Sequence, residues 1–124
     1  MRTVLVALVL TSVAAGAARA ETIASPPSYA EGQAAVICRL YNAGSATVTF
    51  DSTRVVPELA PFDLTIRSTC TGRLAAGKSC SWSARILSGG AHLCRVNVST
   101  RTNVRGVMQL VNTFAYPLNS VEMR

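Results

Sequence analysis

His92 is the only histidine of the chain, so any Ser/His/Asp or Cys/His mechanism would have to use it. It follows Gly89-Gly90, where a strand is expected to begin, and no G-x-S-x-G nucleophile motif accompanies it. The acidic residues are scattered, without the spacing of a glycosidase carboxylate pair or of a calcium loop. The sequence therefore predicts no enzyme, cofactor or metal site, and it predicts that His92 is an ordinarily solvated residue at the end of a strand.

Four cysteines, Cys38, Cys70, Cys80 and Cys94, carry the remaining chemistry. A Cys-x-x-Cys redox motif is absent, and His92-x-Cys94 is the only close pair for zinc, so structural disulfides are expected. Cys38 and Cys94 fall in alternating apolar segments, which favours a buried bridge between two sheets worth about 4 kcal/mol. Cys70 and Cys80 flank a turn-rich segment, where a local bridge would contribute about 3 kcal/mol. Four cysteines allow three pairings, and the sequence alone does not choose among them.

Three arginines, Arg39, Arg95 and Arg105, are the candidate binding residues. Alternation places Arg39 and Arg95 opposite the cysteine face, toward solvent. If residues 91–99 and 104–111 form a hairpin turning near residue 100, Arg95 and Arg105 lie almost opposite each other. Like charges so placed are mildly destabilising unless an anion lies between them, such as sulfate, an anionic polymer or a partner's carboxylate. The alternative is a solvated basic face without a ligand.

Residues 1–20 have the pattern of a cleavable secretory signal peptide. Arg2 supplies the positive charge, an apolar stretch covers residues 4–18, and Ala18-Arg19-Ala20 resembles a cleavage site. A retained membrane anchor is the alternative, but the stretch is short for a span of about 20 residues. Cleavage removes Arg2 and Arg19 and reduces the formal charge from +6 to +4, too little to indicate nucleic-acid binding. A bacterial periplasmic or secreted protein without a membrane span is expected.

The elements that must position these residues are short strands. Apolar residues alternate over 34–41, 62–70, 81–87, 91–100 and 104–111, and Leu64 and Ile66 share one face in the second of these segments. We find no helical period after residue 20. Residues 21–33 are expected to form an extended lead-in with at most one edge strand. Residues 34–124 are predicted to fold as one all-β domain, an antiparallel immunoglobulin-like β-sandwich of six to eight short strands.

Three short motifs resemble segments of small secreted bacterial immunoglobulin-like proteins of uncharacterised function, the choice-of-anchor-like domains. The segment from Cys38 through Asn42 to Gly44 is similar to their C-x-x-x-N-x-G opening. The segment 74–80 resembles their L-x-P-G-x-S-C turn, with Ala76 in place of the proline. Residues 94–96 and 104–110 are similar to the last hairpin of such proteins. The resemblance implies the fold and export, and it implies no functional residue.

Two classes of function remain. The first is a non-enzymatic module of the bacterial envelope that binds another protein or a polymer, for example by strand addition at a sheet edge. The second is a small envelope enzyme or enzyme inhibitor that uses His92 or the arginines. An anion- or polymer-binding protein that uses Arg39, Arg95 and Arg105 is a third hypothesis.

Overall fold

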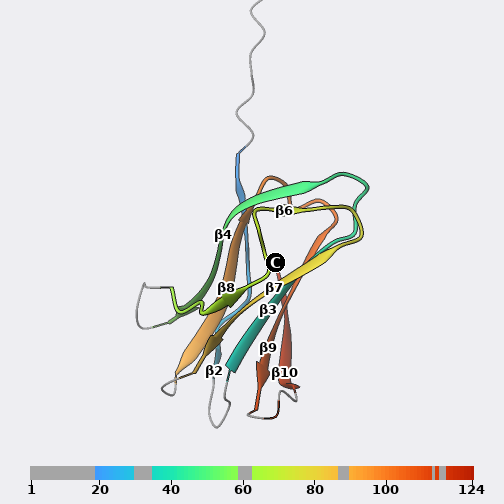
Figure 1. Ribbon diagram of the computed structural model, residues 1–124. Helices are drawn as coiled ribbons and strands as arrows, with labels where there is room; N and C mark the ends of the chain where they lie inside the picture. Colours follow the sequence, from blue (N-terminus) through green and yellow to red (C-terminus); the bar gives the residue numbers. More distant parts are fainter. Residues whose placement is uncertain (1–18, 30–34, 59–62, 87–89, 113, 115–116) are drawn as a thin grey trace, which may run out of the picture.

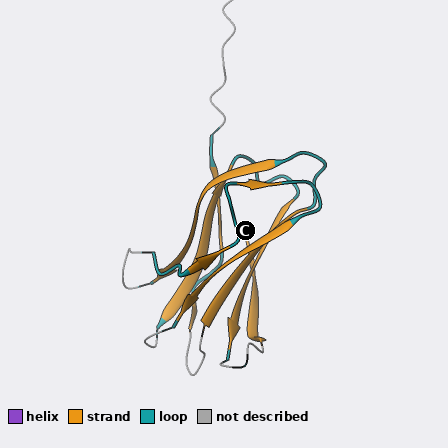
Figure 2. Ribbon diagram, in the orientation of Figure 1, coloured by secondary structure: helices purple, strands orange, loops and turns teal. Residues whose placement is uncertain are grey.

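The computed structural model describes residues 19–29, 35–58, 63–86, 90–112, 114 and 117–124 (Figure 1). The expected signal peptide, up to residue 18, lies outside the described residues, as do residues 30–34 of the expected lead-in. Within the described ranges the chain forms strands and no helix (Figure 2). None of these residues therefore belongs to a helix long and apolar enough to cross a membrane. The strands are β1 (Glu21–Ala24), β2 (Ser28–Tyr29), β3 (Ala35–Asn42), β4 (Val48–Pro57), β5 (Arg67–Ser68), β6 (Arg73–Leu74), β7 (Ser79–Arg85), β8 (Ala91–Val98), β9 (Val104–Val111) and β10 (Pro117–Met123).

These strands form two antiparallel sheets packed against each other, which confirms the predicted all-β sandwich (Figure 1). Sheet A has the order β1-β8-β4-β6, and β2 also pairs with β8. Sheet B has the order β10-β9-β3-β7-β5. The described part of the chain contains ten strands rather than six to eight, because three of them (β2, β5 and β6) are two-residue pieces that the alternation pattern did not detect.

The core lies between the sheets and follows the predicted alternation. In β3 every second residue from Val36 is buried, and in β8 the residues from His92 to Val98 alternate in the same way. Apolar side chains that are at most 2% exposed come from six strands: Ile23, Val36, Cys38, Leu40, Val55, Trp82, Ala84, Cys94, Val96, Val98, Met108 and Leu110. Burial of such apolar surface is the main stabilising term of a domain of this size.

Two expectations about the elements differ from the structure. The lead-in was expected to contain at most one edge strand, but its described residues form two, β1 and β2, both paired with β8, and Ile23 of β1 is only 2% exposed in the core. The segment 62–70 was expected to be a strand with Leu64 and Ile66 on one face. Of its described residues only β5 has strand geometry, and Ile66 is 59% exposed while Leu64 packs on the core.

The physical reason is that this segment crosses from one sheet to the other. The Leu64 amide donates to the Val55 carbonyl in sheet A (2.8 Å), and the Ile66 amide donates to the Ser83 carbonyl in sheet B (2.9 Å). The Asp63 carboxylate accepts from the Val55 amide (3.1 Å), so a side chain occupies a position that a strand's backbone would otherwise take. The segment thereby covers the edge of β4, which β6 leaves unpaired beyond Thr49.

The opposite side of the sandwich is closed by the chain at the end of β10. The Ala24 amide donates to the Arg124 carbonyl and the Arg124 amide donates to the Ala24 carbonyl, both at 2.9 Å. This reciprocal pair joins β1 of sheet A to the end of β10 in sheet B. Both sides of the sandwich therefore carry hydrogen bonds between the sheets.

Asn42 is the centre of a buried loop junction at one end of the sandwich. Its side chain is fully buried and donates from Nδ2 to the carbonyls of Ala46 (2.7 Å) and Leu74 (2.9 Å). Its Oδ1 accepts from the Gly44 amide (2.9 Å). The backbone of Asn42 also accepts from the Gly77 amide (2.8 Å), and Gly77 takes the left-handed conformation (φ 68°). The first two motifs noted in the sequence thus contact each other, and their shared residues have a structural role.

Gly106 of β9 lies directly against the side chain of Met123 in β10. A Cβ atom at this position would lie 2.8 Å from the Cβ and 2.9 Å from the sulfur of Met123, its partner in β10. A glycine is therefore required for this strand pair to pack as it does.

Candidate functional site

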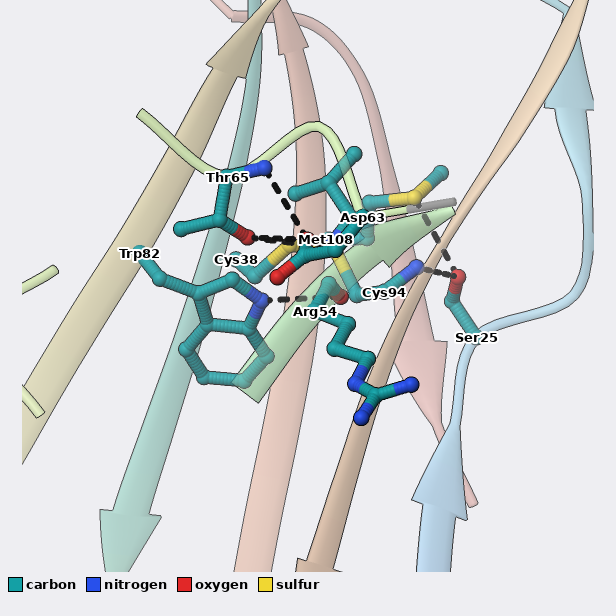
Figure 3. Close-up of a disulfide and its surroundings, with 9 residues drawn as sticks. Ser25, Cys38, Arg54, Asp63, Thr65, Trp82, Cys94 and Met108 are labelled. Atoms are coloured by element: carbon teal, nitrogen blue, oxygen red, sulfur yellow. Dashed lines mark hydrogen bonds between the residues drawn. A yellow bond between two sulfur atoms is a disulfide. The ribbon is translucent and has the colours of Figure 1, made fainter. Parts of the chain in front are cut away.

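The Cys38–Cys94 disulfide crosses the core from sheet B to sheet A (Figure 3). Both cysteines are fully buried, and their Cα atoms are 5.9 Å apart. Trp82, the register partner of Cys38, lies beside the bridge and donates from its indole nitrogen to the Arg54 carbonyl in sheet A (3.0 Å). The bridge and the tryptophan therefore connect the two sheets at the same level, which is a structural role.

Ser25 lies on the other side of this bridge (Figure 3). Its hydroxyl accepts from the Cys94 amide (2.9 Å) and contacts the Met108 sulfur at 3.2 Å. The side chain is only 5% exposed, and these contacts satisfy it as a buried polar group. Ser25 is therefore not an exposed hydroxyl available as a nucleophile.

The Cys70–Cys80 disulfide joins the segment after β5 to the beginning of β7, with the Cα atoms 5.1 Å apart. No cysteine of the chain is free. The structure thus has the pairing that the sequence favoured. The cysteines form structural disulfides and are not metal ligands or redox centres. In the described part of the chain, no group of three His, Cys, Asp or Glu residues could hold a metal ion.

His92 is buried rather than ordinarily solvated, which corrects the sequence-based expectation. Its side chain is 3% exposed, and Nδ1 lies 3.0 Å from the Gly90 carbonyl. In the register of sheet A it stands between Ser28 of β2 and Pro57 of β4. Because these strands cover it on both sides, His92 stabilises the beginning of β8 and does not face an open cleft.

The three candidate arginines do not form one site. The expected hairpin between residues 91–99 and 104–111 is not formed, since β8 lies in sheet A and β9 in sheet B. Arg95 is consequently on the outer face of sheet A, whereas Arg39 and Arg105 are on the outer face of sheet B. Alternation predicted correctly that Arg39 and Arg95 are exposed, but it does not specify which sheet a strand joins.

Each arginine has different neighbours. Arg95 stands directly opposite Arg54 of β4, an arginine that the sequence reasoning did not select. Arg105 lies 3.9 Å from the Glu122 carboxylate on β10. Arg39 borders an open hollow of about 600 Å³ on sheet B that also contains Arg67.

A second surface that the sequence did not locate is the outer edge of β10. β10 pairs with β9 on one side, and within the described residues its other side is bonded only at Arg124, to Ala24. Backbone groups alternate in direction along a strand. The backbone amide and carbonyl of Arg124 point away from β9, toward Ala24. The backbone amide and carbonyl groups of Ser120 and Glu122 therefore also point away from β9. These groups have no hydrogen-bond partner among the described residues.

An open groove of about 520 Å³ runs beside this edge. Ala24, Ser25 and Pro26 form one wall, and Val121, Glu122 and Arg124 form the other. Pro26 and Pro27 lack amide hydrogens, so the chain leaving β1 cannot continue the ladder along β10. The edge therefore stays open next to the point at which the two sheets join.

Comparison with known proteins gives no matching family model, no matching curated protein and no matching solved structure. The assignment of function therefore rests on the sequence and the structure.

Proposed function

We propose that the protein is an exported, non-enzymatic binding module of the bacterial envelope that receives an extended segment of a partner protein along β10. The single observation that carries this proposal is the open outer edge of β10. A partner strand would pair with the backbone of Ser120 and Glu122, which is the general mode of strand addition.

Export is supported by the N-terminal signal pattern and by the two disulfides, which form and persist in oxidising compartments. The resemblance to small secreted bacterial immunoglobulin-like proteins agrees with this compartment. A non-enzymatic role is supported by the burial and backbone contact of His92 and by the enclosed position of the cysteines. The structure uses these potentially reactive side chains to build the sandwich.

A pair of proline variants tests strand addition at β10. Proline removes one amide donor and is tolerated at a sheet edge where that donor faces solvent. Ser120→Pro removes an outward amide, so the fold is expected to stay intact while partner binding is lost. Val121→Pro removes an amide that faces β9, and we expect it to destabilise the protein by about 3 kcal/mol.

The assay is chemical cross-linking in the native bacterial envelope, followed by mass spectrometry. We expect one dominant protein partner with the unmodified chain and none with Ser120→Pro, at equal protein level and equal urea midpoint. Cross-linking of the same partner by a folded Ser120→Pro protein would refute addition at this edge. No partner in either case would refute a protein-binding module.

A further inference from the structure

The open hollow on the outer face of sheet B is lined by arginine, hydroxyl and isoleucine side chains. Two arginines, Arg39 and Arg67, border it on opposite sides of β7. Between them β7 presents Ser81 and Ser83, which belong to the alternating series Ser79-x-Ser81-x-Ser83. Isoleucine side chains, among them the exposed Ile66, supply the apolar part of the lining.

The sheet holds these groups in a fixed arrangement. Arg39 stands opposite Ser81, and Arg67 stands opposite Ser83. Thr69 fixes the far wall, since its hydroxyl accepts from the Ser81 amide (2.9 Å) and its amide donates to the Ser81 carbonyl (2.8 Å). Adjacent strands are about 4.8 Å apart, so the arginine-bearing strands β3 and β5 lie about 10 Å apart.

The charge of the hollow is uncompensated. None of its lining residues is acidic. Glu122, on the same face of the sheet, lies within 4 Å of Arg105 and Arg124. Within the described part of the chain, Arg39 and Arg67 have no ion pair with a carboxylate.

The backbone hydrogen-bonding groups at the centre of the hollow are already paired within the sheet. β7 is paired with β3 on one side and with β5 on the other, so an acidic peptide would find no free backbone groups at its centre. A ligand must instead be recognised through its own hydroxyl and acidic groups. Serine hydroxyls both donate and accept hydrogen bonds, as sugar hydroxyls do, and guanidinium groups bind carboxylate or sulfate.

We propose that this hollow, with Arg39 and Arg67 at its borders and serines between them, is a binding site for an anionic polysaccharide. The arginines bind acidic groups of the polymer, Ser81 and Ser83 bind its hydroxyls, and the isoleucines contact the apolar faces of the sugar rings. Tyr41, exposed on β3 two residues from Arg39, extends this surface. The site does not involve β10 and is independent of the function proposed above.

The test is isothermal titration of the disulfide-intact protein with polygalacturonate and with its fully methyl-esterified form, which has the same backbone without charge. We expect binding of polygalacturonate, and binding at least about tenfold weaker for the neutral polymer and for poly-glutamate. The double variant R39Q/R67Q is expected to lose at least about tenfold in affinity for polygalacturonate. Ser83→Ala, which keeps every charge, is expected to weaken binding by about threefold.

The matched control is R54Q/R95Q, which removes the same charge from the outer face of sheet A. We expect its affinity for polygalacturonate to stay within about twofold of the unmodified protein. Equal losses in the two double variants, or equal affinity for poly-glutamate, would show a general charge effect and overturn the site. Absence of polygalacturonate binding would overturn it as well.

Discussion

Replacement of Asn42 tests whether the loop junction at the end of the sandwich depends on one amide side chain. Asn42→Ala removes three hydrogen bonds, and the Leu74 carbonyl keeps only its register partner Val48 in the strand pair. Each intramolecular hydrogen bond contributes about 0.5–1.5 kcal/mol net. The expected loss is therefore about 2–4 kcal/mol, a large part of the stability of a domain of this size.

Asn42→Asp separates the donor role of this side chain from its acceptor role. The carboxylate keeps the acceptor for the Gly44 amide but places a negative charge against the carbonyls of Ala46 and Leu74. Burial and these carbonyls raise the pKa of the introduced carboxyl above its unfolded value. Relative to the unmodified protein, this variant should be most stable below the unfolded pKa and should lose stability as the pH rises through the folded pKa.

Urea unfolding, followed by the fluorescence of the single tryptophan, measures both variants with the disulfides intact. Asn119→Ala is the matched control, because Asn119 is exposed on β10, and its expected cost is below about 0.5 kcal/mol. A loss of less than 1 kcal/mol for Asn42→Ala, or an Asn42→Asp protein as stable as the original at neutral pH, would refute this account of the junction.

Three further predictions concern the connections between strands and sheets. The double variant C38A/C94A should lose about 4 kcal/mol, with the same urea assay as the measurement, and unchanged stability would contradict the role of the bridge. Trp82→Phe removes the hydrogen bond to the Arg54 carbonyl and part of the buried ring, and should cost about 1–3 kcal/mol, measured by circular dichroism; no cost would contradict a structural role for this side chain. Gly106→Ala should cost about 1–3 kcal/mol because its Cβ would clash with the methionine that faces it on β10, and a neutral effect in thermal unfolding would show that β10 moves freely.

Alternation within the long strands predicted which face of the strand the cysteines occupy. It placed Cys38 and Cys94 inward, and both are fully buried, whereas it failed for Ile66, which does not lie in a long strand. This success has a local cause, because the direction of a side chain in a strand depends only on its position within that strand. The same reasoning favoured the Cys38–Cys94 pairing without excluding the alternatives, since inward-facing cysteines on two long strands can meet across the core, whereas Cys70–Cys80 was favoured because the two residues flank a turn.

Partners of strands were not predictable in the same way. Consecutive strands β8 and β9 were expected to form a hairpin, but the chain between them crosses the sandwich. The Ser99 amide bonds to Thr49 of sheet A, whereas the Asn103 carbonyl accepts from the Ala43 amide, next to β3 of sheet B. Whether a turn stays within a sheet depends on such long-range contacts, which the period of apolar residues does not encode.

The same limit applies to the candidate sites. Arg39 was selected because it is a strand residue that faces solvent, but its neighbours Ser81 and Arg67 come from segments that are distant in sequence. The alternating serines of residues 79–83 were visible in the chain and could have indicated a polar outer face. The open edge of β10 could be recognised only from the hydrogen bonds between Ala24 and Arg124, and this pairing has no signature in the sequence.

The Cys38–Cys94 bridge also determines how the protein responds to mechanical force. When the chain is pulled between residues 21 and 124, tension passes from residue 38 to residue 94 through the sulfur atoms, and the 56-residue separation between them cannot lengthen. Only the two outer segments extend. Reduction of both disulfides would release about 190 Å of additional contour length at about 3.4 Å per residue. Single-molecule stretching would detect this length as a reductant-dependent step.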